Sequence, residues 1–484
     1  MINFTCEQLI SMGRNIPTPF ILNLDKMGQK EEISIEIILR LIPGKRLVGI
    51  SSWRNQKVIL KLFFKPGHSQ RNMLSDIRGI TLLQKRHIPT PEILLQASTT
   101  DKKGAALLIE YLEQGISLKS LVEKADEEEQ VTSHIKVATT LIAKCHQQGL
   151  WQNDIHLDNF MMVEETAYIL DGGDIREVST DVHAEASLQN LALFLAQFTV
   201  GKDRYIPTII SIYQSVRENF PEIELEDFIL RVKRQRNGRL GHLEKKLFRS
   251  TTVNRAIRNQ EKFVVYNRQI HSNEVEKFIE NPGIKIDWDE IIKNGNASTV
   301  YRIALGGDRY VLKRYNLKSF WHGFKYLFRR SRAHHSWRNA WVLNMLGIDT
   351  PHPYLMYEER MVWFLRKRAY FLCEDLNEKN LLDKLEVDFK ELPIEKIVRA
   401  FRALFEIMIE YKISHGDMKA SNFVFHDDRL YVLDLDSMKR HKNRDKFTKA
   451  MKKDLDRFLR NWEGGCLESR FKQLVADINL IERR

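Results

Sequence analysis

Two stretches of the chain carry the same set of polar side chains: an aspartate, an asparagine five residues later, and a second aspartate 17 residues after the first. Carboxylate and amide oxygens are the hard ligands that Mg²⁺ prefers. A further carboxylate can orient a hydroxyl group and accept its proton. Phosphoryl transfer needs both, because it depends on charge neutralisation and positioning more than on covalent chemistry. The six residues are Asp154, Asn159, Asp171, Asp417, Asn422 and Asp434.

The spacing predicts a role for each residue. Asp154 and Asp417 are predicted to orient an acceptor hydroxyl and are the candidate bases. A lone aspartate or asparagine in a loop is usually a turn residue or a helix cap, but two matching sets in the same order are hard to attribute to chance. The predicted metal-binding pairs are Asn159 with Asp171 and Asn422 with Asp434.

An apolar run that contains a lysine precedes each set. Lys61 lies in the run 58–63 and Lys313 in the run 310–315, and the β-branched residues and flanking turns favour strands. A lysine on such a strand can hold nucleotide phosphates, although taken alone it would more simply be an edge or snorkelling residue. After each strand the sequence indicates a helix that ends at prolines, and then an apolar strand with an acidic end.

A phosphate-covering loop is less clearly marked. In the second copy, Gly295 and Ser298 lie in a stretch of small residues whose backbone N–H groups could approach phosphates. In the first copy, residues 43–46 and 49–52 occupy the matching place. An ordinary hairpin turn explains either stretch equally well.

The composition is that of a globular protein. The chain has 484 residues, of which 43% are hydrophobic and 29% charged, so two or three domains are expected. Its four cysteines form no Cys-x-x-Cys pair, which argues against a disulfide framework or a zinc site. With neither a membrane-spanning apolar run nor a secretory signal, a cytoplasmic protein is expected. The net charge of +12 suggests an anionic partner.

The two copies resemble one protein family. The first reads His-x2-Gly-x4-Asp-x-His-x2-Asn-Phe over residues 146–160, and the second reads His-Gly-Asp-x-Lys-Ala-Ser-Asn-Phe over residues 415–423. These stretches look like the catalytic loop of the lipopolysaccharide kinase family, which includes core heptose kinases and 3-deoxy-manno-octulosonic acid kinases. The second copy looks closer still to a two-domain branch of that family.

The resemblance implies an α+β fold of two tandem bilobal protein-kinase-like domains. We expect these domains over residues 1–230 and 281–484, joined by a basic, partly helical linker over residues 231–280. The resemblance also implies an enzyme that uses ATP and Mg²⁺ to phosphorylate a sugar hydroxyl of the lipopolysaccharide core. Its partners would be the anionic glycolipid lipid A–core and, peripherally, the inner-membrane surface from the cytoplasmic side, with no nucleic acid expected.

One departure from the kinase pattern concerns the partner of the strand lysine. Kinases usually pair this lysine with a glutamate on the following helix. Asp76 takes that place for Lys61, and is predicted to hold it at the nucleotide, whereas Ser336 takes the place for Lys313. Another residue would have to substitute in the second copy. The candidate substitutes are Glu358 and Glu359.

Three functions remain open at this point. A kinase of lipopolysaccharide core sugar is favoured by the lysine, aspartates and asparagine that both copies retain. A pseudokinase or regulatory scaffold, in one or both copies, is favoured by the missing helix acid. A small-molecule or protein kinase is the third, because antibiotic and choline kinases share the His-Gly-Asp loop.

A basic, aromatic-rich segment lies beside the Lys313 strand. Residues 309–348 hold nine lysines and arginines and no acid. The pattern suits an anionic membrane surface or single-stranded nucleic acid, and equally a helix with buried aromatics and solvated arginines. The resemblance favours the glycolipid membrane. The predicted contacts are Arg329, Arg330 and Arg332.

Overall fold

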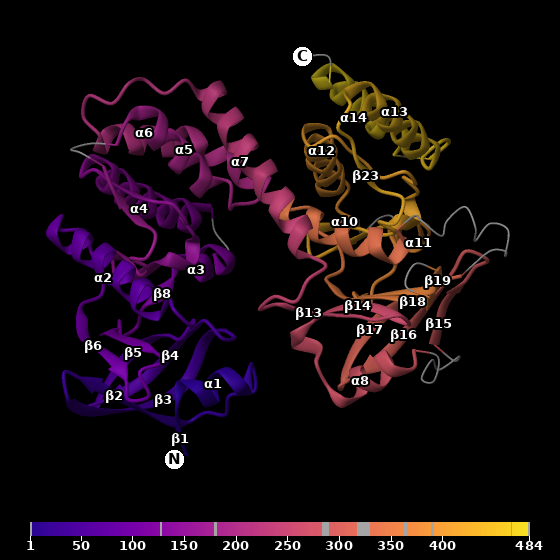
Figure 1. The fold of residues 1–484 in the computed structure, drawn as a ribbon. Coiled ribbons are helices and arrows are strands. Elements are labelled where there is room, and N and C mark those ends of the chain that lie inside the picture. Colours follow the sequence, from indigo (N-terminus) through magenta and orange to yellow (C-terminus); the bar gives the residue numbers. More distant parts are fainter. Residues whose placement is uncertain are drawn as a thin grey trace. The chain divides into compact units, whose positions relative to one another are not determined.

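The computed structural model describes residues 2–125, 128–178, 182–282, 290–316, 330–362, 365–388, 392–465 and 467–482. Helices and strands are both abundant, so the predicted α+β class is confirmed. The chain divides into two compact units (Figure 1). Unit 1 comprises residues 1–198 and 202–237, and unit 2 comprises residues 199–201 and 238–484.

Unit 1 begins with a seven-stranded sheet in the order β1-β2-β3-β4-β5-β7-β6. The β4–β5 hairpin turns at Arg54 and Asn55, whose φ angles of 50° and 60° are the left-handed pair that a tight hairpin needs. Lys61 consequently lies in the middle of a ladder, opposite Val48 on one side and Leu107 on the other. The strands are β1 (Ile2–Phe4), β2 (Phe20–Lys26), β3 (Gln29–Ile42), β4 (Arg46–Trp53), β5 (Gln56–Phe63), β6 (Ile93–Thr99) and β7 (Ala105–Glu110).

The helical part of unit 1 encloses a separate apolar core, to which Phe160, Phe194 and Tyr213 contribute. The short strands on either side of the loop that carries Asp154 and Asn159 lie against it. The helices are α1 (Cys6–Met12), α2 (Ser69–Lys85), α3 (Leu118–Lys124), α4 (Glu128–Gln147), α5 (Ala184–Leu195), α6 (Ile206–Val216) and α7 (Leu225–Lys246), the last of which continues into unit 2. The short strands are β8 (Ile116–Ser117), β9 (Leu150–Gln152), β10 (Phe160–Val163), β11 (Thr166–Ile169) and β12 (Ile175–Glu177).

Unit 2 also contains a seven-stranded sheet, in the order β13-β14-β18-β19-β17-β16-β15. Its pairings are antiparallel. Lys313 again lies within a ladder, between Val300 and Phe371. The strands are β13 (Asn254–Arg258), β14 (Lys262–Asn267), β15 (Ile291–Asn294), β16 (Ser298–Leu305), β17 (Asp308–Tyr315), β18 (Pro353–Val362) and β19 (Leu365–Glu374).

The structure differs from the expected linker over residues 231–280. The stretch contains β13, β14 and helix α8 (Asn273–Glu280), and β14 pairs with β18 inside the sheet of unit 2. The apolar residues of β14 are buried, so this stretch belongs to the core of unit 2. Its two strands are short and contain arginine and asparagine among their apolar residues. Strand β18, which pairs with β14, lies far along the chain. A local pattern therefore does not reveal them.

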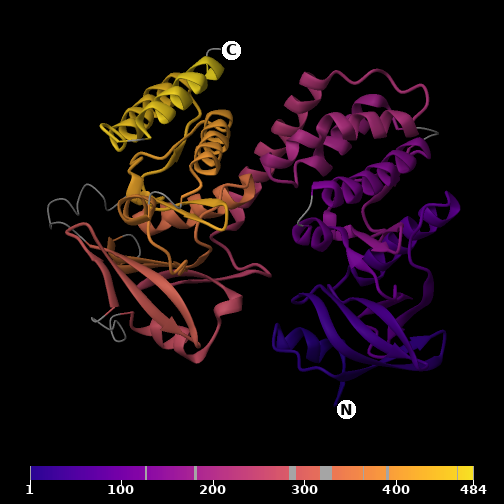
Figure 2. The same ribbon diagram turned by 180° about the vertical axis from the view of Figure 1, so that it is seen from behind.

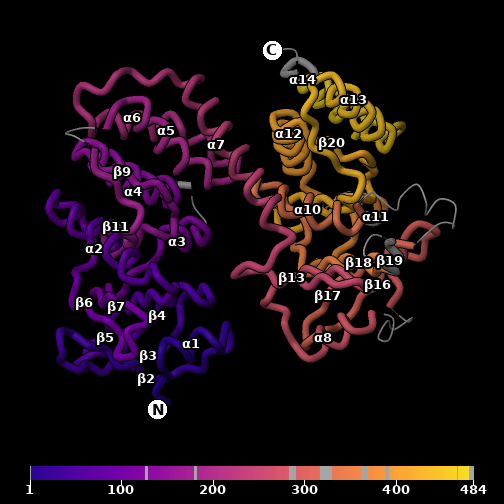
Figure 3. The backbone as a smooth tube through the Cα atoms, in the orientation of Figure 1, coloured from indigo at the N-terminus to yellow at the C-terminus, as the bar shows by residue number. Residues whose placement is uncertain are grey.

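Helices α12, α13 and α14 of unit 2 lie at the end of the unit opposite its sheet, as both ribbon views show (Figures 1 and 2). Helix α10 packs on the sheet through β18 and β19, and the tube in Figure 3 shows it between the sheet and α12. The helices are α10 (Arg332–Leu346), α11 (Leu381–Asp388), α12 (Ile394–Glu410), α13 (Arg444–Arg460) and α14 (Glu468–Glu482). The short strands are β20 (Ile413–Ser414), β21 (Phe423–His426), β22 (Arg429–Val432) and β23 (Lys439–Arg440).

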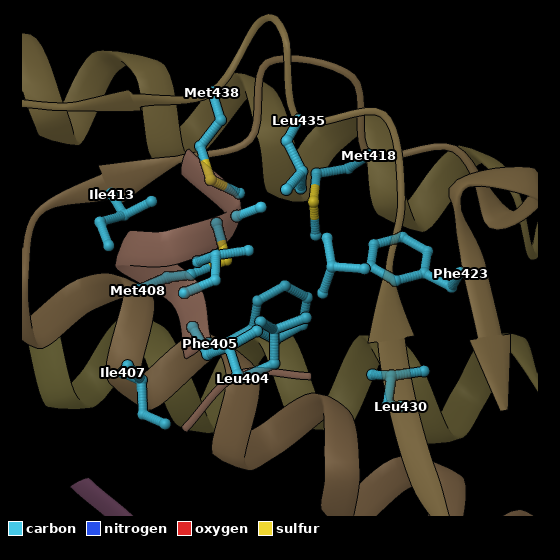
Figure 4. Close-up of a cluster of buried hydrophobic side chains, with 14 of the residues drawn as sticks. Leu404, Phe405, Ile407, Met408, Ile413, Met418, Phe423, Leu430, Leu435 and Met438 are labelled. Carbon is cyan, nitrogen blue, oxygen red and sulfur yellow. The ribbon is translucent and has the colours of Figure 1, made fainter. Parts of the chain in front are cut away.

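A buried apolar cluster supports the second set of polar residues from beneath. Met418, Phe423 and Leu435 each come directly after one residue of that set, and all three are at most 4% exposed. Figure 4 shows these side chains converging with those of α12. Burial of these apolar neighbours anchors the backbone segments that carry the polar residues. The α12 side chains labelled there are Leu404, Phe405, Ile407 and Met408.

Within the described residues, no helix is both long enough and apolar enough to cross a membrane.

Candidate active site

Lys313 is the centre of the site in unit 2. Its Nζ donates to Asp434 Oδ1 at 2.5 Å and lies 3.4 Å from Asp436 Oδ2. Burial acts to lower the pKa of the Lys313 ammonium, but the oxygens of Tyr315 and the two aspartates outweigh it and raise that pKa above its ordinary value. Lys313 is therefore a firmly charged cation in a largely buried place.

A cavity of about 430 Å³ opens beside this lysine. Lys313, Asn422 and Asp434 all line it, so the structure brings the predicted lysine and one predicted metal pair to the same space. Ser298 also lines the cavity, at the start of β16. Gly295 lies in the β15–β16 turn, where its N–H donates to the Ser298 carbonyl group at 3.1 Å. Gly295 and Ser298 thus lie in a hairpin turn, a geometry that is compatible with a phosphate-covering loop and with an ordinary turn.

The loop that carries Asp417 is closed by a hydrogen bond within the predicted set. Asn422 Nδ2 donates to the carbonyl oxygen of Asp417 at 2.8 Å. This bond occupies the amide nitrogen of Asn422 and leaves its oxygen as the group available to a cation. The Asp417 carboxylate accepts from Lys419 Nζ at 2.8 Å and is partly exposed.

Asp454 holds the same loop from helix α13. Its carboxylate accepts the backbone N–H groups of His415 and Gly416 at 2.6 and 2.9 Å. Gly416 has a φ of +86°, and a Cβ there would lie 3.1 Å from Ser437, so the position suits glycine. Burial raises the pKa of Asp454. The spacing of the predicted set gave no sign of Asp454, because it lies on a helix after the set ends.

Unit 1 arranges its lysine with different acids. Lys61 Nζ lies 3.0 Å from Asp76 Oδ2 and 3.6 Å from Asp171 Oδ1, so the predicted helix partner is in contact. Burial raises the pKa of Asp76 to about 6. For Asp171 burial acts in the same direction, but Lys61, the hydrogen bond with Asp76 and Arg46 together outweigh it and lower the pKa of that carboxyl. Arg46 adds a second cation, 3.9 Å from Asp171 Oδ2.

The loop of unit 1 repeats the bond seen in unit 2. Asn159 Nδ2 donates to the carbonyl oxygen of Asp154 at 2.9 Å. The Asp154 carboxylate lies 2.7 Å from His156 Nε2. This contact has the largest influence on the pKa of Asp154, and that pKa is lowered below its ordinary value. Asp417 has Lys419 at the corresponding place, two residues on. Both loops thus give the candidate base a basic neighbour.

The residues predicted to bind a metal fit Mg²⁺ in their chemistry. Asn422 and Asp434 present an amide and a carboxylate oxygen to one cavity, and such hard donors are those that Mg²⁺ takes, together with water and phosphate oxygens. In the described residues, no group of three or more His, Cys, Asp or Glu side chains surrounds a common point. The protein would therefore supply few ligands, which is usual where a nucleotide supplies the others.

Two residues of the site were not predicted for it. Asp436 lies two residues beyond Asp434 and is almost fully buried. Arg332, predicted as a membrane contact, instead donates to Asp436 Oδ2 at 2.7 Å and to the Ala297 carbonyl group at 3.2 Å. Arg330 is exposed, and Arg329 lies outside the described residues. The sequence did contain a signal for Asp436, because an acid follows Asp434 by two residues and no acid stands at the same place after Asp171.

Glu358 and Glu359 do not replace the missing helix acid. Glu358 Oε2 accepts from Arg360 at 3.2 Å, and Glu359 Oε1 accepts from the Tyr370 hydroxyl at 2.9 Å. The carboxylates that contact Lys313 come instead from the loop that follows β22.

Comparison with known proteins agrees with this arrangement. Residues 290–478, which include the site of unit 2, match the model of the Lipopolysaccharide kinase (Kdo/WaaP) family. The resemblance to a family of kinases of the lipopolysaccharide core, predicted from the sequence, is confirmed over these residues. A solved structure, WaaP in complex with acyl carrier protein, is weakly similar, at 13% identity and a TM-score of 0.28 over 43% of this chain and 86% of that one. No curated protein matched the chain.

Proposed function

We propose that the protein is an ATP-dependent phosphotransferase that phosphorylates a sugar hydroxyl of the lipopolysaccharide core, and that unit 2 performs the transfer. The observation that carries the proposal is the convergence of Lys313, Asn422 and Asp434 on one cavity of about 430 Å³. That volume lies in the range of small-molecule sites, roughly 300–1,000 Å³. The family of residues 290–478 supports the same substrate class.

Each residue of unit 2 has a role in this proposal. Lys313 binds phosphate oxygens of the nucleotide, exchanging part of its contact with Asp434 for them. Asp417 orients the sugar hydroxyl and accepts its proton, and Lys419 steadies the Asp417 carboxylate. Asn422 and Asp434 would hold Mg²⁺, which when bound neutralises phosphate charge.

We also propose that the two units are tandem bilobal domains of the protein-kinase type. Each combines a seven-stranded sheet that carries the lysine with a helical part that carries the loop. The Asn-to-Asp backbone bond is 2.8 Å long in one unit and 2.9 Å in the other. Such agreement between separate sequences supports a repeated fold.

A pseudokinase role for unit 1 is the second candidate. It is favoured by Arg46, whose guanidinium lies beside Asp171. A second cation next to this carboxylate competes with a metal ion for its oxygens. In that case unit 1 would bind nucleotide weakly, or regulate unit 2, without transferring phosphate.

Separate substitutions in the two loops test these proposals. We expect Asp417→Ala to remove phosphate transfer from labelled ATP to lipid A–core, and Asp154→Ala to retain most of it. Wild-type transfer by the double variant would contradict the kinase assignment. Equal losses in the two single variants would assign catalysis to both units. Mass spectrometry of lipopolysaccharide from a deletion strain completes the test, since an unchanged phosphate count would point to a small-molecule or protein substrate.

We further propose that unit 2 meets the cytoplasmic face of the inner membrane through helix α13. This helix buries Phe447, Met451 and Phe458 on one side. Its exposed side presents basic residues at intervals of three, four and seven positions, which places them along one face. A row of this kind complements anionic headgroups, each charge contributing on the order of 1 kcal/mol. The row consists of Lys446, Lys449, Lys453 and Arg460.

A further inference from the structure

The helices that follow the two lysine strands can be placed in register by an equivalent contact. Thr90 and Thr350 each donate a side-chain hydrogen bond, of 2.8 and 2.7 Å, to the carbonyl group two residues before the second aspartate of the set. Asp76 precedes Thr90 by 14 residues, and Ser336 precedes Thr350 by 14 residues. Asp76 and Ser336 therefore occupy equivalent positions in the structure as well as in the sequence.

Ser336 does not take over the task of Asp76. Its hydroxyl group shares a 2.8 Å hydrogen bond with the hydroxyl group of Tyr315, and it is buried. The second carboxylate that reaches Lys313 belongs to Asp436, two residues beyond Asp434. The residue two beyond Asp171 in unit 1 is Gly173. Unit 1 thus has the acid on the helix and the small residue in the loop, and unit 2 has the small residue on the helix and the acid in the loop.

We propose that Asp436 is the positioning residue of Lys313, in place of the helix acid that positions Lys61. The proposal rests on the proposed function of unit 2, in which Lys313 binds nucleotide phosphates. The Asp436 side chain is 3% exposed, and its Oδ2 lies 3.4 Å from Lys313 Nζ and 2.7 Å from an Arg332 nitrogen. The Asp436 carboxylate therefore connects its own loop to strand β17, through Lys313, and to the first turn of α10, through Arg332.

The packing of helix on loop explains why only one position carries the acid. In unit 1, a Cβ on Gly173 would lie 3.3 Å from Asp76 Oδ1 and 3.5 Å from Asp171 Oδ1. A carboxylate at residue 173 would therefore enter the space that Asp76 fills, and two like charges there would repel each other. With serine on the helix in unit 2, that space is open to Asp436.

A second exchange at the same contact agrees with the first. In unit 1 the backbones of α2 and the loop touch, because a Cβ on Gly79 would lie 1.8 Å from the Gly172 carbonyl oxygen. Three residues after Ser336, the matching position of α10 holds Asn339. Its amide donates to the carbonyl groups of Leu435 and Met438 at 2.7 and 3.0 Å. In unit 2 the Asn339 side chain connects helix and loop, whereas in unit 1 the backbones of helix and loop are in direct contact.

The test reads the two lysines separately in one molecule. An acyl-phosphate derivative of ATP acylates lysines beside the bound phosphates, and peptide mass spectrometry distinguishes Lys313 from Lys61. We expect Asp436→Asn to lower Lys313 labelling about tenfold, the size of effect usual for losing a hydrogen bond to a charged group, with Lys61 labelling unchanged. Ser336→Asp combined with Asp436→Asn should restore most of it, and Ser336→Asn combined with Asp436→Asn is the matched control.

The mirror exchange in unit 1 extends the test. Asp76→Ser should lower Lys61 labelling, and Asp76→Ser with Gly173→Asp should recover it.

A second readout needs no nucleotide: acetic anhydride should acylate Lys313 several times faster in Asp436→Asn than in the wild type, because the lysine has lost a carboxylate partner, and the Ser336→Asp rescue should reverse this.

The outcomes separate the inference from the proposed function. Unchanged Lys313 reactivity toward both reagents in Asp436→Asn overturns the positioning role. A loss that Ser336→Asn repairs as well as Ser336→Asp also overturns it, because the charge would then be irrelevant. If the wild type shows no ATP-dependent labelling of Lys313 but the anhydride pattern holds, the positioning role stands and the proposed function of unit 2 fails.

Discussion

Asn422 binds the backbone of Asp417 through its amide nitrogen, at 2.8 Å, and so closes the loop between them with its amide oxygen left for a cation. One side chain therefore serves both the shape of the loop and the predicted metal site. Asn159 and Asp154 share the same relationship in the other unit. Mutation of Asn422 can therefore be measured by two effects, one on the stability of the loop and one on the predicted metal site.

Replacement of Asn422 should affect both stability and transfer. Asn422→Ala removes a buried side-chain hydrogen bond, which costs about 1–2 kcal/mol, and also removes a predicted metal ligand. We expect transfer to fall at least a hundredfold, of the size seen when one electrostatic contact to a transition state is lost. Urea unfolding and transfer assays measure the two effects. Asn159→Ala is the matched control, and it should lower stability similarly while leaving most of the transfer.

Asp454 should be important for the stability of unit 2. Asp454→Ala leaves the N–H groups of His415 and Gly416 without their partner, and the buried one, that of His415, costs about 1–3 kcal/mol when unsatisfied. We expect a clear fall in the free energy of unfolding, together with loss of transfer as the loop loosens. Asp456 is exposed on the same helix, and Asp456→Ala should change stability by less than about 0.5 kcal/mol. Equal effects of the two substitutions would contradict the role of Asp454.

Helix α2 should not tolerate a methyl group at Gly79. Gly79→Ala would drive a Cβ into the backbone of Gly172, so the helix must move away from the loop and carry Asp76 away from Lys61. We expect a loss of about 1–3 kcal/mol, as for other overpacked sites. In helix α7 a Cβ on Gly241 would meet nothing within 4 Å. Gly241→Ala should therefore stabilise the chain, by up to about 1 kcal/mol.

The stability of unit 2 should fall in mild acid. Burial lowers the pKa of His352 and of His441 below the ordinary imidazole value of 6.5. The unfolded chain then binds protons that the folded chain does not, so the free energy of unfolding rises with pH through this window and falls as the pH drops below about 6.5. Unfolding curves at pH 7.5, 6.5 and 5.5 measure the slope. His352→Gln and His441→Gln should reduce it, and His242→Gln, on the exposed side of α7, provides the control.

The α13 row should make membrane attachment sensitive to salt. Changing Lys446, Lys449 and Lys453 to Glu should release the protein from vesicles that contain lipid A, and wild-type binding should weaken as salt shortens the Debye length. ATP binding should change little, since the row lies on the exposed side of its helix. Binding that is equally strong after the substitutions excludes α13 as the membrane contact. Preference for RNA over the vesicles would reassign the row to nucleic acid.

Arg332 cannot be tested as a membrane contact by charge reversal. Its guanidinium is bound to Asp436 at 2.7 Å. Arg332→Glu would set two carboxylates against each other beside Lys313, so a loss of activity would report on the site and not on the membrane.

The sequence by itself determined the two polar sets and the lysine strands. Asp154 and Asn159, or Asp417 and Asn422, are close along the chain, so their spacing already determines the loop that the backbone bond closes. Regular alternation in the strands likewise predicts burial of one face locally. These features depend on neighbours a few residues away, and local pattern records such neighbours well.

Only the tertiary structure decided which acid stands in for the missing helix acid beside Lys313. Lys61 takes Asp76 from the next helix, whereas Lys313 takes Asp436 from a loop 123 residues later. The choice depends on how closely helix and loop pack, which Gly79 and its counterpart on α10 control. The same holds for β14, whose burial depends on pairing with β18. Contacts between distant segments are set by the volumes and charges that meet in the fold, and no spacing along the chain encodes them.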